Sequence, residues 1–218
     1  MSQATFDEAL KWMADHLSAN KVGIGVDPAT TEKGVSNPTA VAVVEREGAG
    51  FIIRWVCVWK TADPDIATER FVRIVETINA RPEGGRARRL CLDATNERYY
   101  AKLLKKELRG LVPVDLVVSS ETIEMPGGEK ITRKQFLGSQ YVAELEDNHL
   151  TLPPERYLRE DHRLVKREKG SFVCEADNQG RHGDTFDACK LAIQALLAKG
   201  GDGKAYPTSV GEFKGGMQ

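Results

Sequence analysis

The sequence predicts an α/β fold in which one mixed five-stranded sheet carries helices on both faces. Three strand-like segments come first and follow one another directly, so we expect them to pair antiparallel as a meander. From there on, helical and strand-like segments alternate, which is typical of parallel strands. The chain of 218 residues is 41% hydrophobic, which is enough to bury one sizeable core.

The strand predictions depend on short apolar runs that end at turn-forming residues. The run at 22–27 is mostly Val, Ile and Gly, and its last residue, Asp27, is followed by Pro28, which ends regular structure. Residues 47–50, Glu-Gly-Ala-Gly, favour a hairpin turn between the next two runs. The predicted strands are residues 22–27, 39–46, 51–59, 89–93 and 114–118.

The helix predictions depend on apolar residues that recur every three or four positions. Gly110 is placed to end the helix before it, and the last helix is apolar nearly all round, as expected of a helix buried against a sheet. The predicted helices are residues 66–79, 97–109, 131–147 and 184–199. We expect a lead-in helix and linker at 1–20 (helix 6–17), one domain at 21–199, and a flexible Gly-rich tail at 200–218.

Two polar stretches complete the predicted layout. Residues 153–161 have no apolar periodicity and predict irregular structure. Residues 163–175 predict an added basic β-hairpin that turns near Lys169 and Gly170. Three arginines before the fourth strand predict a solvated sheet edge: Arg86, Arg88 and Arg89.

Acidic residues stand at the ends of elements that should meet at one rim of the sheet. Asp27 ends the first strand, Asp93 ends the fourth, and Asp184 opens the last helix, with Asp187 one turn further on. In this order of elements, which is that of the ribonuclease H-like fold, the first and fourth strands are parallel neighbours. Their carboxyl ends then lie side by side, so we expect the acids to converge.

Such a cluster of carboxylates is costly unless a cation neutralises it. Carboxylate oxygens suit Mg²⁺ or Mn²⁺ rather than zinc, and two such ions about 4 Å apart can activate water and stabilise the leaving oxygen in phosphodiester hydrolysis. Each acid also has a simpler explanation. Asp27 and Asp93 could form local turns, and Asp184 could favour a helix N-terminus, typically by about 0.3–1 kcal/mol.

Three short motifs follow one another along the chain. The first is Gly-Val-Asp-Pro-Ala at 25–29 with the segment at 37–44, the second is Cys-Leu-Asp-Ala-Thr at 91–95, and the third is Arg-His-Gly-Asp-Thr-Phe-Asp-Ala at 181–188. With the basic hairpin before the third motif, they resemble the nuclease domain of phage large terminase subunits, within the RuvC-like nucleases. The resemblance covers residues 21–198 and depends on the order and spacing of the motifs.

This resemblance implies a metal-dependent endonuclease that cuts double-stranded viral DNA concatemers during genome packaging. It implies Asp27, Asp93 and Asp184 as catalytic metal ligands. Family members often carry two adjacent Asp residues in the third motif, where Gly183 takes the first place here, so Asp184 and Asp187 compete for the ligand role. We favour Asp184 as the ligand. Asp187 stays a candidate for binding a second ion or for contacting the ligands of the first. His182 is a candidate for supporting catalysis at a metal-bound water or a phosphate.

The resemblance also implies partners, namely a packaging ATPase domain, a small terminase subunit and a portal, in the cytoplasm of a bacterial host cell. The motif G-x-x-x-x-G-K-[ST] is absent, so this chain is not the motor. The four cysteines form no C-x-x-C pair and are expected to be free thiols in a reducing cytosol. No apolar run reaches about 18 residues, so we expect no membrane partner.

Double-stranded DNA is the expected substrate, although the net charge of −1 gives no sign of a nucleic-acid partner. The contact must therefore come from local clusters. The tip of the predicted hairpin carries Lys166, Arg167 and Lys169, with Arg163 just before the tip, and these cations could contact phosphates; a solvated hairpin is the alternative. Other functions of the same fold stay open: a Holliday-junction resolvase, an RNA–DNA hybrid nuclease, or a non-catalytic assembly module.

Overall fold

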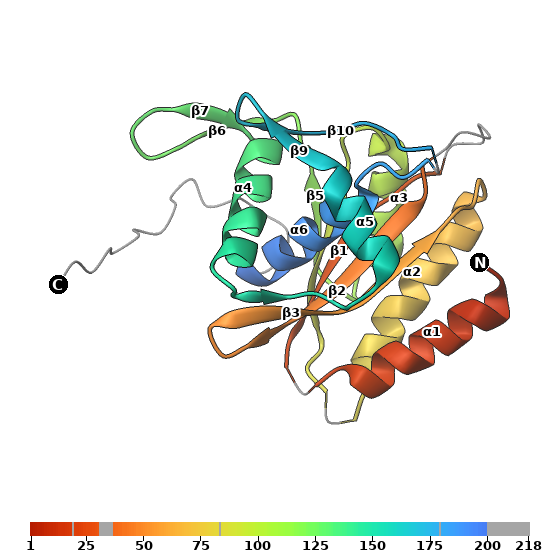
Figure 1. The fold of residues 1–218 in the computed structure, drawn as a ribbon. Coiled ribbons are helices and arrows are strands. Elements are labelled where there is room, and N and C mark those ends of the chain that lie inside the picture. Colours follow the sequence, from red (N-terminus) through yellow and green to blue (C-terminus); the bar gives the residue numbers. More distant parts are fainter. Residues whose placement is uncertain (19, 31–36, 83, 179, 200–218) are drawn as a thin grey trace.

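The computed structural model describes residues 1–18, 20–30, 37–82, 84–178 and 180–199, and it places a mixed sheet between two layers of helices (Figure 1). The predicted tail at 200–218 lies outside the described residues. None of the described helices is both long enough and apolar enough to cross a membrane.

The main sheet has an antiparallel half and a parallel half. Its strands are β1 (Val22–Asp27), β2 (Thr39–Glu47), β3 (Gly50–Trp59), β4 (Ala87–Asp93), β5 (Val114–Val117) and β8 (Leu150–Thr151). β1, β2 and β3 form the antiparallel meander, and β4 pairs parallel with both β1 and β5. The predicted mixed sheet is confirmed, and β8, which was not predicted, adds a sixth strand parallel to β3.

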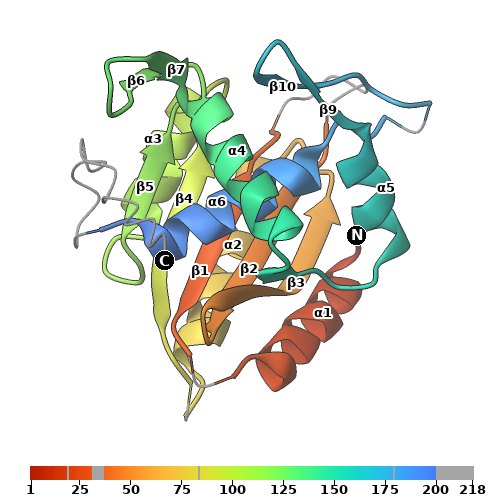
Figure 2. The same ribbon diagram turned by 60° about the vertical axis from the view of Figure 1, so that its left-hand side comes forward.

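Helices cover both faces of this sheet (Figures 1 and 2). One face carries α1 (Gln3–His16), α2 (Pro64–Asn79) and α3 (Arg98–Glu107), and the other carries α4 (Arg133–Glu146), α5 (Arg156–Leu164) and α6 (Asp184–Leu197). Strand β2 serves both layers because its side chains alternate: Val41 and Val43 join the core under α1–α3, whereas Ala42 and Val44 join the core under α4–α6.

Helix α6 lies unusually close to β1, and two glycines make this approach possible. A Cβ atom on Gly25 would lie 2.0 Å from the carbonyl oxygen of Ala188, and one on Gly23 would lie 2.5 Å from that of Ala192. No side chain fits there without moving the helix. The glycines of β1 thus bring the start of α6 next to the end of β1.

Two of the polar stretches differ from their prediction. The stretch at 153–161 is largely helical, because it contains most of α5, and Arg163 lies in the last turn of that helix. The basic hairpin is confirmed as β9 (Val165–Glu168) and β10 (Ser171–Cys174), which turn at Lys169 and Gly170. A second hairpin, β6 (Thr122–Glu124) with β7 (Lys130–Thr132), was not predicted.

The predicted solvated edge is wrong for two of its three arginines. Only Arg86 is exposed. The Arg88 guanidinium donates to the carbonyl oxygens of Ala195 (2.8 Å), Leu196 (2.6 Å) and Ala198 (2.7 Å), at the C-terminal end of α6. Arg89 is buried and forms an ion pair with Asp115 of β5. A charged side chain buried by tertiary contacts looks the same in the sequence as a solvated one.

Candidate active site

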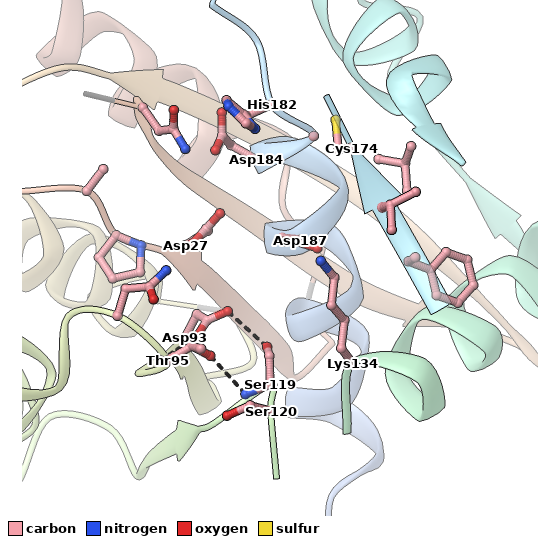
Figure 3. Close-up of a pocket in the computed structure, with 18 of the residues that line it drawn as sticks. Asp27, Asp93, Thr95, Ser119, Ser120, Lys134, Cys174, His182, Asp184 and Asp187 are labelled. Atoms are coloured by element: carbon pink, nitrogen blue, oxygen red, sulfur yellow. Dashed lines mark hydrogen bonds between the residues drawn. The ribbon is translucent and has the colours of Figure 1, made fainter. Parts of the chain in front are cut away.

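A pocket of about 750 Å³ opens at the rim where β1 and β4 end. All four predicted carboxylates line it, as does His182, and they come from three separate stretches of the chain (Figure 3). The structure therefore brings together the acids that the sequence placed at the ends of β1, β4 and the start of α6: Asp27, Asp93, Asp184 and Asp187.

Asp27 lies close to the other three acids of the pocket. Burial first, and then repulsion from Asp187, Asp93 and Asp184, raises the pKa of Asp27 well above its usual value. Lys190 opposes this shift but does not cancel it. A bound cation at this rim would relieve the same repulsion.

Asp93 is held in place by its own loop and by the segment after β5. Its carboxylate accepts hydrogen bonds from the backbone N–H of Thr95 (2.7 Å) and the hydroxyl of Ser119 (3.1 Å), and Ser119 N–H donates to the hydroxyl of Thr95 at 2.9 Å (Figure 3). The bond to Thr95 is the local turn considered as the alternative for Asp93. The turn orients the carboxylate at the rim, so the two explanations are compatible.

Asp184 is positioned by a residue of another helix. α6 begins after Gly183, which has φ +79° and no side chain to cap the helix. Asp161 of α5, which is fully buried, supplies the cap instead. It accepts from Gly183 N–H (2.9 Å), Thr185 N–H (2.8 Å) and the Thr185 hydroxyl (2.5 Å), and thereby fixes the first turn of α6.

The Asp184 side chain itself is almost entirely buried. Burial, followed by repulsion from Asp161 and Asp187, raises the pKa of Asp184 to about 7. Its Oδ2 atom is buried and has no hydrogen-bond partner among the described residues. A buried carboxylate oxygen without a partner is costly, which suits an oxygen that receives a ligand from the pocket.

Asp187 has a different environment, because it forms an ion pair with the buried side chain of Lys190 on the same helix. Lys190 was not singled out in the sequence, although it is the one cation within α6. The pair distinguishes the two competing acids: Asp184 has a free oxygen, whereas Asp187 already has a cation beside it.

The far wall of the pocket is polar and was largely missed from the sequence. Lys134, in the first turn of α4, points into the pocket from the side opposite Asp27, near Ser119 and Ser120 (Figure 3). Lys134 is held there because its backbone N–H donates to the carbonyl of Ser119 at 3.0 Å. No local sequence signal marks Lys134, since it reaches the pocket only through the packing of α4. The two serines come directly after β5, which is parallel to β4.

The basic hairpin forms another wall of the same pocket. Val165 and residues 171–174 line it, and the hairpin's cations, Lys166, Arg167 and Lys169, are exposed beside it. Arg167 lies over the ring of Phe172, 6.0 Å from its centroid. Arg163 is exposed on the neighbouring helix α5. The hairpin that carries three of the predicted cations therefore forms a wall of the carboxylate pocket, but the four cations are not among the residues that line it.

The donor set has the chemistry of a divalent-cation site, since it consists of carboxylate oxygens. Within the part of the chain that the structure describes, no three His, Cys, Asp or Glu side chains are already spaced to hold one ion. The unpartnered Oδ2 of Asp184 and the repulsion that raises the pKa of Asp27 both fit a bound cation. Binding would then require the carboxylates to turn toward one another.

No protein-family model matches the sequence, and no curated protein matches it. The fold does match solved structures. The large terminase nuclease from thermophilic phage G20c has a TM-score of 0.55 and 13% identity, with 85% of this chain and 97% of that chain covered. The human cytomegalovirus terminase nuclease domain has a TM-score of 0.52 and 13% identity, covering 88% and 93%.

The large terminase from a second thermophilic bacteriophage also matches, with a TM-score of 0.56 and 12% identity. The match covers 87% of this chain and 44% of that chain. The protein therefore has the fold of terminase nuclease domains, and the resemblance expected from the three motifs is confirmed at the level of the fold.

Proposed function

We propose that this protein is a divalent-metal-dependent endonuclease of the terminase kind, which cuts double-stranded viral DNA concatemers during genome packaging. One observation carries the proposal. Four carboxylates from three separate segments line a single pocket at the strand ends, on the fold of terminase nuclease domains. A fold alone does not determine a function, so the proposal depends on the residues of the pocket.

In this proposal Asp27, Asp93 and Asp184 hold Mg²⁺ or Mn²⁺, and Asp187 is available to a second ion. Such ions activate water and stabilise the leaving oxygen of a phosphodiester. The chain's own residues prepare the site: Ser119 orients Asp93, and Asp161 fixes the turn that carries Asp184. His182, at the pocket edge, supports catalysis by contacting the phosphate or the attacking water.

The substrate side of the proposal uses the cations beside the pocket. Lys134 binds the phosphate that enters the pocket, because it is the cation that points in from the wall opposite Asp27. Lys166, Arg167 and Lys169 of the hairpin, with Arg163 of α5, contact neighbouring phosphates. Contacts of this kind position DNA without reading its sequence, so we expect little sequence preference.

A packaging ATPase domain, a small terminase subunit and a portal are the proposed partners, and the cytoplasm of a bacterial host is the proposed site of action. The match to less than half of a large terminase chain supports a role beside a further part of such a machine.

The test is cleavage of supercoiled plasmid in the presence of Mg²⁺ or Mn²⁺. We expect nicked and linear DNA with wild type, and at least a hundredfold loss with Asp27→Asn or Asp93→Asn. Asp147→Asn, an exposed aspartate at the end of α4, is the matched control and should cut normally. Absence of cutting by folded wild type, or equal cutting by all variants, contradicts the proposal.

The same preparation distinguishes the other functions of this fold. Branched DNA and RNA–DNA hybrids are offered beside the duplex, and preferred cutting of either would indicate a resolvase or a hybrid nuclease. A non-catalytic assembly module would show neither cutting nor stabilisation by divalent ions in thermal melting.

A further inference from the structure

Helix α3 presents a row of cations on its exposed face, away from the core. Arg98, Lys102 and Lys105 follow one another at helical spacing, and Lys106 flanks them. Arg109 continues the row in the turn directly after the helix. Steps of four and three residues keep the first three on one side of the helix. The opposite side holds Tyr100, Ala101 and Leu104, which are buried. All five cations are exposed. The row therefore belongs to the surface and takes no part in the core.

The cations of this surface outnumber the acids of the same segment and are not paired with them. Residues 98–109 contain five basic residues and one acidic residue, whereas the whole chain has a net charge of −1. Within the described residues, none of the five cations forms an ion pair. Other surface cations of the protein do, for example Lys11 with Asp15 and Arg156 with Glu160. An unbalanced basic face of this kind favours binding of a polyanion.

The position of α3 connects this surface to the pocket. Asn96 and Glu97, directly before the helix, line the pocket on one side, and residues 171–174 of the β9–β10 hairpin line it on another. Figure 2 shows α3 and the hairpin toward the same end of the molecule, on opposite sides in that view. The acidic pocket thus has an exposed basic surface on both sides.

We propose that the α3 row binds the phosphate backbone of duplex DNA that extends from the pocket on the side opposite the β9–β10 hairpin. This inference depends on the proposed function, because it names a second contact surface for the same substrate. From Arg98 to Lys105 the helix rises about 10 Å, and one strand of B-DNA passes about three phosphates over that length. Arg109, in the turn after the helix, extends the row. The row is long enough to contact several of them at once.

The test compares two variants of equal net charge. In the first, the row is neutralised by Arg98→Gln, Lys102→Gln, Lys105→Gln and Arg109→Gln. In the second, four exposed cations remote from the pocket are neutralised by Lys11→Gln, Lys21→Gln, Arg46→Gln and Arg86→Gln. All eight side chains are exposed, so both variants should keep the fold, which circular-dichroism melting checks.

Binding of a labelled 30-base-pair duplex is measured by fluorescence anisotropy in EDTA, over a range of salt concentrations. We expect the α3 variant to bind at least tenfold more weakly at low salt. The plot of log affinity against log salt concentration should become less steep by up to about four, because each lost phosphate contact removes about 0.9 from the steepness of the slope. The remote variant should bind as wild type does.

Equal weakening in both variants, or unchanged binding in the α3 variant, overturns the inference. The proposed function fails separately. If wild type cuts plasmid and the α3 variant binds DNA normally, the proposed nuclease function stands and the proposed DNA contact of α3 is refuted. If wild type never cuts and the α3 variant binds DNA more weakly, the DNA contact of α3 stands and the proposed nuclease function is refuted.

Discussion

Replacing Asp161 by alanine removes the cap of α6 without touching the pocket. The carboxylate of Asp161 accepts three hydrogen bonds, from Gly183 N–H, Thr185 N–H and the Thr185 hydroxyl, and all three donors are buried. In Asp161→Ala these donors lose their partner. The first turn of α6, which carries Asp184, then has no anchor on its N-terminal side.

The expected loss of stability follows from two contributions. Loss of a helix cap typically costs about 1 kcal/mol, and a buried donor left without a partner costs about 1–3 kcal/mol. Relief of the repulsion between Asp161 and Asp184 offsets a part of this. We expect a decrease in the free energy of unfolding of about 3 kcal/mol, which for a chain of this size corresponds to a melting temperature lower by roughly 10 °C.

The measurement is thermal and chemical denaturation of wild type, Asp161→Ala and Asp161→Asn. The asparagine keeps one acceptor oxygen, so its loss should be smaller than that of alanine. Asp147→Ala, at an exposed aspartate, should stay within about 0.5 kcal/mol of wild type. An Asp161→Ala protein as stable as the Asp147→Ala control would refute the cap and, with it, our account of how Asp184 is positioned.

Three further predictions concern the pocket and the helix behind it. The pKa of Asp184 is raised to about 7 in the folded protein, so between about pH 4 and 7 the folded state holds a proton that the unfolded chain has released. The free energy of unfolding in EDTA should therefore fall as the pH rises from about 4 to 7. Asp184→Asn should flatten that part of the profile; an unchanged slope contradicts the assignment. Saturating Mg²⁺ or Mn²⁺ at 100 times its dissociation constant should stabilise wild type by about 2.7 kcal/mol and Asp27→Asn far less, as read from melting curves. Gly25→Ala should destabilise the protein by about 3 kcal/mol or more in denaturant titration, because its Cβ would lie 2.0 Å from the Ala188 carbonyl oxygen; near-native stability would show that α6 can move away freely.

The parts of the fold that were predictable have strong local patterns. The apolar run that ends at Asp27 and Pro28 specifies a buried strand and its end, and the spacing of helix and strand segments specifies that β4 lies parallel to β1. These two facts are enough to place Asp27 and Asp93 at one rim. The third acid followed from the start of α6, which has an equally clear apolar pattern.

The parts that were missed depend on tertiary contacts. Helix α5 buries only Leu158 and Asp161, so its sequence has almost no apolar periodicity. Strand β8 has two residues and exists because β3 offers an edge to pair with. Lys134 reaches the pocket only after α4 has packed on the sheet. A single charged residue such as Asp161 carries no local sign of whether it will be solvated or will cap another helix.

The contacts of Arg88 with the C-terminal end of α6 bear on how short the chain can be. Its guanidinium reaches carbonyl groups as far along as Ala198, and the cation is partly withdrawn from solvent between β4 and the helix end. A chain truncated before this point would lose the acceptors and leave Arg88 without them. We infer that the shortest fragment able to keep α6 in place, and with it the spacing of Asp27 and Asp184, ends no earlier than Ala198.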